Sequence, residues 1–383
     1  MNINKHIAAL CIGTFCLGVA ELGIVPVLTD IAHSFSVTIP QAGLYVSAYA
    51  AGVCVGIIGL LVFARDANLK KTLLVSAFLI LGGNLGASLA WSDFSMLAAR
   101  FVSGMPHGIF FALGAIVCER LAKPGQASRD VTLMVLGQTS ANLVGVPLGS
   151  LIGFALSWRL VFASIALIAV LLIFALVKWL PSLPVTPKPL KQEIASLKSW
   201  YPWIILSGVA LGSGGFYAYY SYVEPIMRSV AHISAASMTL VMLLAGAGMF
   251  SGNLLSAPLT KHFSDVVLVL FGQTLIAVAI LGAYFFSSSP LTALLTMATS
   301  AFGYYFLAGP MQALIISGAG DGKVIIAALG QIAYNGANAL GAFGGGEAIR
   351  LMGSPDACAL PGTILSFLAT LLFLSLLLKH PRR

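Results

Sequence analysis

The chain has 383 residues, of which 59% are hydrophobic and only 8% are charged, and its formal net charge is +8. A soluble globular protein carries roughly 25% charged residues, because its surface has to face water. A single core in a chain of this length could not hide so much apolar side chain. The composition therefore excludes a soluble protein and predicts one that spans a lipid bilayer. The Lys and Arg residues lie almost entirely in short gaps between apolar runs, which argues against a nucleic-acid binder.

Twelve apolar runs follow one another along the chain, and each has about the 20 residues that a spanning helix needs. Each run is continuously apolar and lacks the alternation of a lipid-facing strand, so we expect helices rather than a β-barrel. The first run contains Glu21 and leads directly into the second, which indicates a retained helix rather than a signal peptide. The runs lie near 7–29, 41–64, 72–91, 94–118, 131–155, 159–180, 201–226, 236–260, 266–288, 290–318, 323–349 and 357–378.

A polar stretch over residues 181–199 separates the first six runs from the last six. It begins with several prolines and continues with lysines, which is typical of a solvated linker. We therefore predict an all-α membrane protein with 12 transmembrane helices in two pseudo-symmetric bundles of six. The N-terminal bundle is expected over 1–180, a cytoplasmic linker over 181–200 and the C-terminal bundle over 201–383.

The basic residues between the runs predict the orientation of the chain, because cytoplasmic loops carry an excess of Lys and Arg. With an even number of spans both termini share one side of the membrane, and sixteen Lys and Arg residues lie on that side. The opposite side has three, which are Arg159, Arg228 and Arg350. We therefore expect both termini in the cytoplasm.

Two local matches indicate an internal repeat of the six-helix unit. Gly137-Gln138-x3-Asn142 in the fifth span returns as Gly330-Gln331-x3-Asn335 in the eleventh. After the first span, the segment 25–33 (Val-Pro…Ile-Ala-His) is echoed by the segment 224–232 (Glu-Pro…Val-Ala-His) after the seventh. Spans five and eleven, and spans one and seven, are equivalent in a duplicated six-helix unit, so both matches support the same frame.

Several motifs in the fourth, fifth and seventh spans resemble those of a known transporter family. Gly145-Val-Pro147-Leu-Gly149-x3-Gly153 resembles the antiporter motif of the drug:proton antiporters, and Arg100-Phe-Val-Ser-Gly104 resembles their Arg-bearing motif. The stretches 100–108 and 216–225 (Phe-Tyr-Ala-Tyr-Tyr-Ser-Tyr-Val-Glu-Pro) are similar to the arabinose efflux permease subgroup of bacterial exporters. With two six-helix halves and a basic central loop, the chain resembles the major facilitator superfamily along essentially its whole length.

The loop after the second span departs from the superfamily pattern Gly-x-x-x-Asp-Arg-x-Gly-Arg-Lys. In this chain the pattern is reduced to Phe-Ala-Arg-Asp-Ala-Asn-Leu-Lys-Lys over 63–71, so the glycines and the Arg after the Asp are missing. Asp66 and two lysines remain. Because of this departure, the gating role of the superfamily's loop cannot be transferred in full to this chain, and Asp66 is a gating candidate only.

The resemblance implies a secondary active transporter in the bacterial inner (cytoplasmic) membrane, surrounded by lipid and acting on a small molecule with protons. The fifth-span motif favours proton-coupled efflux of a small neutral or amphipathic organic solute, such as a sugar or a drug. A single chain can form the whole pathway between its halves, so we expect a functional monomer. No nucleic-acid partner is expected.

Two alternatives stay open at the level of sequence. An uptake or facilitated-diffusion permease for a sugar- or nucleoside-like solute would use the same fold, and a non-transport receptor or scaffold is the more remote alternative. An enzyme is not expected, because the sequence has no His-Glu-x-x-His, no Gly-x-Ser-x-Gly and only scattered histidines. We also expect no cofactor and no metal site.

Glu21 and Asp30 are the carboxylates that could couple proton movement to transport. A charge within the hydrocarbon region costs roughly 2.5–3.5 kcal/mol, so Glu21 in mid-span should face a cavity or a partner. A carboxyl group that is protonated on one side and deprotonated on the other is what proton antiport requires. In the structural alternative, the carboxyl group of Glu21 forms a hydrogen bond with a neighbouring helix and never exchanges a proton. Asp30 follows nine residues later near the non-cytoplasmic end and is a candidate second proton site.

Arg100 and His107 in the fourth span complete the coupling candidates. The resemblance implies that Arg100 is the proton-linked arginine of the family, and the alternative is an interfacial arginine that extends to water or locks a loop. His107 could titrate near neutral pH, but a lone intramembrane histidine is more often a hydrogen-bonded packing residue.

Glycines spaced four residues apart in the fifth span are the main gating candidates. Gly145, Gly149 and Gly153 lie along one helix face, which lets another helix approach closely. Pro147 would bend or loosen the backbone between them. The resemblance implies that this motif controls leak and gating. The alternative is ordinary packing of small residues. Both roles depend on the close approach of a neighbouring helix to the fifth span.

Substrate contacts are expected from uncharged polar and aromatic side chains that face a central cavity, because lipid would not tolerate their donors and acceptors. Such groups suit a neutral or weakly amphipathic solute, whereas a sugar phosphate would require more cavity arginines than Arg100. Some of the tyrosines are expected in the interfacial belt instead. The substrate candidates are Gln138, Asn142, Tyr217, Tyr220, Tyr304, Gln312, Gln331, Asn335 and Asn338.

Overall fold

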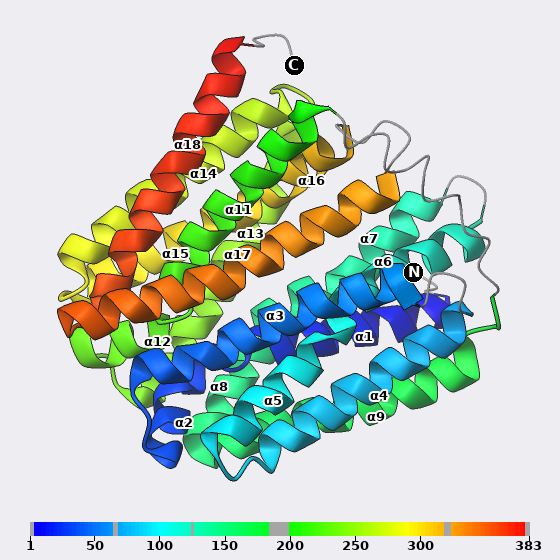
Figure 1. Ribbon diagram of the computed structural model, residues 1–383, viewed down its shortest axis with the longest axis horizontal. Helices are drawn as coiled ribbons and strands as arrows, with labels where there is room; N and C mark the ends of the chain where they lie inside the picture. Colours follow the sequence, from blue (N-terminus) through cyan, green and yellow to red (C-terminus); the bar gives the residue numbers. More distant parts are fainter. Residues whose placement is uncertain (1–3, 64–67, 124–125, 184–198, 318–322, 380–383) are drawn as a thin grey trace. The chain divides into compact units, whose positions relative to one another are not determined.

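The computed structural model describes residues 4–63, 68–123, 126–183, 199–317 and 323–379, and these residues are almost entirely helical (Figure 1). No β-strand occurs among them. The predicted all-α class is therefore confirmed. The chain divides into two compact units, one formed by Met1–Val27 and Ala48–Pro187 and the other by Leu28–Ser47 and Lys188–Arg383.

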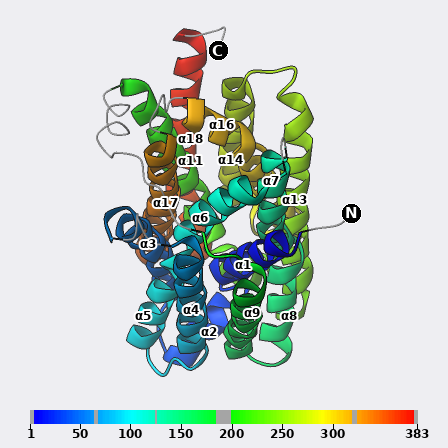
Figure 2. The same cartoon turned by 90° about the vertical axis from the view of Figure 1, so that its right-hand side faces the viewer.

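The first unit is a bundle in which α1 lies beside α7 and α9, and α4 lies beside α5 and α9 (Figure 2). The helix α3 (Ile39–Phe63) contributes its part from Ala48 onward. The other elements are α1 (Lys5–Leu22), the 3-10 turn η1 (Val25–Val27), α4 (Leu69–Ser88), α5 (Asp93–Gly104), α6 (Pro106–Leu121), α7 (Ala127–Ser140), the π-helical turn η2 (Ala141–Gly145), α8 (Val146–Ala155) and α9 (Trp158–Trp179).

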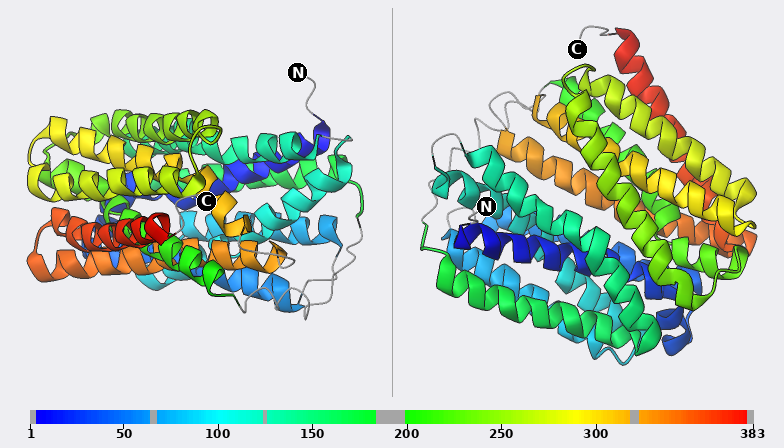
Figure 3. Two further views of the ribbon diagram at one scale, coloured as in Figure 1. Left: turned by 90° about the horizontal axis from the view of Figure 1, so that it is seen from above. Right: turned by 180° about the vertical axis from the view of Figure 1, so that it is seen from behind.

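The second unit is a bundle in which α11 lies beside α17 and α18, and α15 lies beside α13 and α14 (Figure 3). It includes α2 (Leu28–Phe35) and the first part of α3. The other elements are α11 (Trp200–Tyr220), α12 (Val223–Pro225), the π-helical turn η4 (Ile226–Val230), η5 (Ala235–Ser237), α13 (Met238–Leu259), α14 (Asp265–Phe286), α15 (Pro290–Phe306), α16 (Ala308–Ser317), α17 (Lys323–Met352), η6 (Pro355–Cys358) and α18 (Ala359–Lys379).

All twelve predicted spans are helical in the part of the chain that the structure describes. Ten of them are long and apolar enough to cross a membrane by length and composition. The other two are α11 and α17, which have 21 and 30 residues and are therefore long enough as well. They are less apolar because α11 carries tyrosines and α17 carries glutamine and asparagines. The predicted linker over 181–200 lies mostly outside the described residues.

Prolines determine where the long spans are interrupted. A proline has no backbone N–H, and its ring clashes with the carbonyl group of residue i−4 in a regular helix. The fourth span accordingly breaks between α5 and α6 at Pro106, and the tenth breaks between α15 and α16 just before Pro310. In the fifth span the turn before Pro147 widens into η2, and in the seventh α11 ends before Pro225. Such π-helical turns are common at functional sites.

Candidate functional site

Arg100 on α5 is completely buried in the first unit, with a relative exposure of 0%. Its guanidinium donates to the backbone carbonyl oxygens of Ala20 (2.5 Å) and Glu21 (3.4 Å) at the end of α1. The guanidinium carbon also lies 4.5 Å from the ring centroid of Tyr49 and 5.8 Å from that of Phe162. Aromatic faces attract a cation, so Arg100 is enclosed by partners and does not extend to water.

Tyr49 on α3 connects Arg100 with His107. Its hydroxyl lies 2.9 Å from Nδ1 of His107 and donates more weakly to the carbonyl oxygen of Leu17 at 3.4 Å. The imidazole stacks on Phe111 with a ring separation of 5.1 Å. The tyrosine and the histidine are both buried, so the two groups form a short polar chain inside an apolar bundle.

Glu21 lies at the end of α1 and is half-buried. Its carboxylate interacts electrostatically with Tyr49, Arg100 and His107. Three of the four predicted coupling residues, Glu21, Arg100 and His107, therefore lie together in the first unit. The four side chains Glu21, Tyr49, Arg100 and His107 are called the coupling cluster below.

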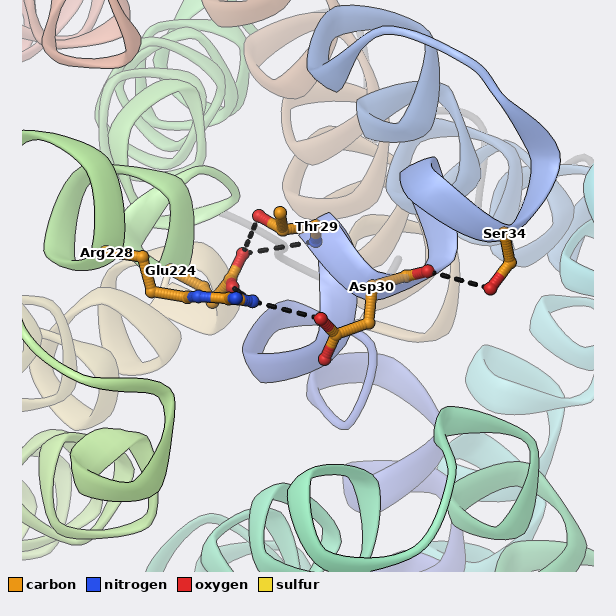
Figure 4. Close-up of polar contacts among 5 residues, drawn as sticks. All are labelled: Thr29, Asp30, Ser34, Glu224 and Arg228. Atoms are coloured by element: carbon orange, nitrogen blue, oxygen red, sulfur yellow. Dashed lines mark hydrogen bonds and ion pairs between the residues drawn. The ribbon is translucent and has the colours of Figure 1, made fainter.

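Asp30 lies in a different cluster, at the start of α2 in the second unit (Figure 4). Its carboxylate accepts from the guanidinium of Arg228 at 3.0 Å. The same guanidinium donates to Glu224 Oε1 at 2.9 Å, and Glu224 Oε2 accepts from the backbone N–H (3.2 Å) and the hydroxyl (2.5 Å) of Thr29. Glu224 has 0% side-chain exposure, whereas Asp30 has 40% and Arg228 has 29%.

Close packing holds the start of α3 against α17 and the end of α11 in the same unit. The Ser47 hydroxyl donates to the carbonyl oxygen of Ala339 at 2.8 Å, and the Tyr222 hydroxyl donates to that of Ala342 at 2.7 Å. Gly43 leaves room for this tyrosine, because a Cβ atom there would lie 1.9 Å from the Tyr222 hydroxyl oxygen. Residues 28–47 thus have both polar and close-packed contacts with the rest of the second unit.

The predicted substrate tyrosines gather into one aromatic cluster between α11 and α15. The rings of Phe216 and Tyr304 stack with centroids 4.1 Å apart and an interplanar angle of 6°. Tyr220 stacks on the other side of Phe216 at 4.9 Å, and Tyr217 meets Tyr304 edge-on at 5.7 Å. Tyr217 and Tyr220 are buried, while Tyr304 is half-buried and donates to the hydroxyl of Ser213 at 3.2 Å.

The predicted substrate amides divide into buried and half-buried groups. Asn142, Asn335 and Asn338 are buried, and the Asn335 amide donates to the carbonyl oxygen of Gln331 on its own helix at 2.9 Å. The side-chain oxygen of Asn338 accepts no hydrogen bond from the described residues and has a relative exposure of 1%. The half-buried amides are Gln138, Gln312 and Gln331.

The fifth-span glycines lie against side chains of neighbouring helices. A Cβ atom at Gly145 would lie 2.4 Å from Val19 Cγ2, and one at Gly153 would lie 2.3 Å from Val27 Cγ1. At Gly149 the nearest atom would be 3.3 Å away. Gly145 and Gly153 therefore allow η2 and α8 to approach α1 and η1, as the small-residue spacing predicts, and Gly149 faces Val161 of α9. Asp66 lies outside the described residues, and its gating role stays a prediction.

Sequence reasoning missed Tyr49, Thr29 and Glu224 as site residues. Glu224 could have been found, because it is an acidic residue within a predicted span, where a charge is as costly as it is at Glu21. Tyr49 carried no such signal, since a tyrosine in an apolar run is as easily a core or interfacial residue. Its role depends on contacts with α5 and α6, which only the fold brings together.

A sequence profile of the Major Facilitator Superfamily matches residues 10–345. The chain is 37% identical to the proposed transporter AraJ of Escherichia coli K12, over 96% of this chain and 93% of that protein. It is 29% identical to the inner membrane transport protein YdhP of Escherichia coli K12, over 100% of this chain and 98% of that protein.

Two solved structures share this arrangement of helices. A D-xylose–proton symporter superposes with a TM-score of 0.76 at 16% identity, covering 95% of this chain and 96% of that one. A bacterial homologue of the human lysosomal transporter Spinster, in an inward-facing conformation, superposes with a TM-score of 0.75 at 17% identity, covering 97% of both chains. At these identities the likeness concerns the fold alone.

Proposed function

The chain belongs to the Major Facilitator Superfamily and is a multi-pass membrane transporter, and from this premise we propose that it is a proton-coupled antiporter. It would export a small neutral or amphipathic organic solute, such as a sugar or a drug, in exchange for protons. The observation that carries the proposal is the coupling cluster, where the completely buried guanidinium of Arg100 donates to the backbone carbonyl group of Glu21 and interacts electrostatically with its carboxylate. The antiporter-like motif of the fifth span supports export as the direction.

Coupling requires that the proton and the solute influence each other's binding. In the coupling cluster, protonation of Glu21 would change the charge balance around Arg100, whose guanidinium is held against α1 by the carbonyl groups of Ala20 and Glu21. A change at the carboxylate would thus reach the backbone of α1, and Gly18 of the same helix packs tightly against Gln138 and Ala141. A change of protonation at Glu21 would therefore be transmitted through α1 to the predicted substrate residues of the fifth span.

The proposed solute class follows from the aromatic cluster and the amides. Aromatic faces with hydroxyl groups bind flat or amphipathic molecules through stacking and through hydrogen bonds at the rim. The open acceptor of Asn338 would be satisfied by a hydroxyl or amine group of a solute. Neither the aromatic cluster nor the amides favour a strongly charged solute. We therefore expect neutral sugars, nucleosides or amphipathic drugs rather than phosphorylated compounds.

Replacement of Glu21 by Gln is expected to abolish proton release upon solute binding. The variant keeps the size and polarity of the side chain but cannot exchange a proton, so a solute can no longer displace one. Purified protein in weakly buffered detergent solution would be mixed with neutral sugars, nucleosides and amphipathic drugs while the pH is recorded. Glu119→Gln, which changes an exposed carboxylate in the same unit, is the matched control and should release protons like the wild type.

The outcomes of that experiment separate the possible functions. Solute binding without proton release, equal in wild type and Glu21→Gln, would contradict antiport through Glu21 and favour facilitated diffusion. Proton uptake instead of release would indicate symport. Absence of solute flux in liposomes for every compound tested, with folded protein, would favour a receptor or scaffold.

Replacement of Tyr304 by Leu is expected to weaken solute binding by about tenfold, since a ring pair contributes about 0.5–1.5 kcal/mol beyond its buried area. Tyr304 is the half-buried end of the aromatic cluster and is therefore its most accessible ring. The measurement is the KM of transport in proteoliposomes. Tyr284→Leu, which removes a tyrosine packed edge-on against Phe285 at 5.1 Å, should leave KM unchanged, and an equal loss in both variants would contradict the assignment.

A further inference from the structure

Glu224 is a buried acid outside the coupling cluster, and its contacts join parts of the chain that are far apart in sequence. It follows α11 in the short helix α12, and none of its side chain is exposed. Its partner Thr29 lies 195 positions earlier, in the first turn of α2, and donates both its N–H and its hydroxyl to the carboxylate. A buried carboxylate is costly unless it is paired and hydrogen-bonded, and here both conditions are met.

The geometry of these bonds depends on the charge of Glu224 (Figure 4). One carboxylate oxygen accepts two donors from Thr29, and the other accepts the guanidinium of Arg228. Hydrogen bonds to an ionised acceptor are roughly twice as strong as neutral ones. A proton on either oxygen would replace an acceptor by a donor that faces Thr29 or Arg228, so protonation weakens the attachment of α2.

The net charge around Arg228 depends on whether Glu224 is ionised. Asp30 of α2 and Glu224 share the single cation of Arg228 in η4, so protonation of one acid leaves a matched pair. Other titratable groups on the neighbouring elements have partners elsewhere or face the solvent. Glu347 of α17 pairs with Arg350, Asp356 of η6 bonds Ser354, Cys358 is buried beside the Tyr219 carbonyl, and His33 and His232 are exposed.

The segment that Glu224 attaches is also held by contacts that do not depend on charge. The start of α3 packs against Tyr222 through Gly43, and Ser47 bonds the backbone of α17. The π-helical turn η4, which carries Arg228, follows Pro225 directly, so the backbone that presents the cation is already irregular. Of the contacts that hold this segment, protonation of Glu224 would weaken only the bonds with Thr29, while the Arg228–Asp30 pair and the packing contacts remain, which suits a reversible loosening of the segment.

We propose that Glu224 is a second proton-binding residue of the transport cycle, whose ionised form holds residues 28–47 firmly against α12 and η4 and whose protonated form loosens this attachment. The inference rests on the proposed proton coupling. It adds a site on the side of the membrane opposite to the predicted cytoplasmic termini.

Accessibility of a buried cysteine three residues before Glu224 tests this role. Ser221 is completely buried just before Glu224, and its hydroxyl has no hydrogen-bond partner among the described residues, so Ser221→Cys disturbs little. The substitution is made in a chain whose native cysteines are replaced by alanine. Intact cells are treated with a membrane-impermeant maleimide between about pH 8 and about pH 5.5, a range in which a buried acid can titrate. Each rate is divided by that of unfolded protein at the same pH, which removes the ionisation of the thiol itself.

The normalised labelling of Cys at position 221 is expected to rise about tenfold as the pH falls, since a tenfold change corresponds to the loss of one charge-assisted bond. With Glu224→Gln the labelling should be fast at every pH, because the neutral amide mimics the protonated acid. Glu347→Gln breaks a Glu–Arg pair of similar spacing in the same unit without touching α2, and it should behave like the wild type. Slow labelling of Glu224→Gln, or a pH response that persists in it, would overturn the proposal.

Thr29→Val provides a second variant that keeps the acid in place. It removes the hydroxyl donor to Glu224 but leaves the backbone donor, so the ionised form loses one of its bonds and the labelling midpoint should move to higher pH. An unchanged midpoint in a folded variant would contradict the proposal. Failure of antiport itself is a separate result: the wild type and Glu21→Gln would then bind solute equally without releasing protons, while the labelling response of Glu224 would be unaffected.

Discussion

Arg100→Met is expected to lose most of its transport activity and to be less stable, because each buried carbonyl group that loses its donor costs about 1–3 kcal/mol. The guanidinium is completely buried, donates to two carbonyl groups of α1 and lies between the rings of Tyr49 and Phe162. Methionine fills part of this volume but satisfies neither carbonyl group and leaves Glu21 without its buried cation. Transport in proteoliposomes, at a protein level matched by size-exclusion profile, measures the loss.

Arg159 provides a matched control for Arg100. Its guanidinium also bonds backbone carbonyl groups, those of Ser88 (3.0 Å) and Ala90 (2.6 Å), and also lies over an aromatic ring, that of Trp158 at 4.3 Å. It is half-buried at the end of the bundle and lies outside the coupling cluster. Arg159→Met should therefore lower thermal stability but retain most transport per folded molecule, and equal losses of transport in both variants would show that Arg100 only stabilises the fold.

Arg100→Lys distinguishes the effect of the positive charge at position 100 from the effect of the guanidinium's shape. Lysine keeps the positive charge but is a compact donor that cannot bond two carbonyl groups while it stacks on a ring. We expect partial transport, about tenfold below the wild type, if the charge next to Glu21 is what matters most. Activity as low as that of Arg100→Met would instead show that the geometry of the guanidinium controls coupling.

The spans were predictable because bilayer thickness and residue chemistry act locally. A helix that crosses lipid needs a continuous apolar run, and the runs near 41–64 and 159–180 appear as α3 (Ile39–Phe63) and α9 (Trp158–Trp179). Breaks within spans are equally local, since Pro310 acts on the turn just before it. The boundary between units is not local: α3 is one continuous helix, yet its first residues pack with the second unit.

The candidate site was predictable only where a residue is costly in lipid by itself. Glu21, Arg100 and His107 stand out by this criterion, and the fold brings them together. Tyr49 joins Arg100 to His107 through a ring face and a hydroxyl, and neither contact leaves a sequence pattern. Asp30 was expected as a candidate second proton site near the non-cytoplasmic end, and its pairing with Arg228 from 198 positions away left no signal in the sequence.

Gly341→Ala and Gly345→Ala are each expected to destabilise the protein by about 1–3 kcal/mol, the usual cost of overpacking. A Cβ atom at either position would lie 2.3 Å from a backbone carbonyl oxygen of α11, that of Gly214 for Gly341 and that of Ala218 for Gly345. A backbone atom cannot turn away as a flexible side chain can, so α11 and α17 must move apart. Thermal unfolding in detergent should show a midpoint about 5 °C lower or more.

Gly344 lies on the same helix with nothing within 4 Å of its would-be Cβ atom, and it provides the internal control. Gly344→Ala should be neutral or slightly stabilising, because alanine is the better helix former by about 1 kcal/mol. Gly149→Ala, whose nearest neighbour would be a valine methyl group at 3.3 Å, should fall between the two. If all four variants unfold together, close approach to the α11 backbone does not limit stability. If the midpoints instead follow the expected order, glycine packing between α11 and α17 limits stability more than the packing of Gly149 in the antiporter-like motif of the fifth span.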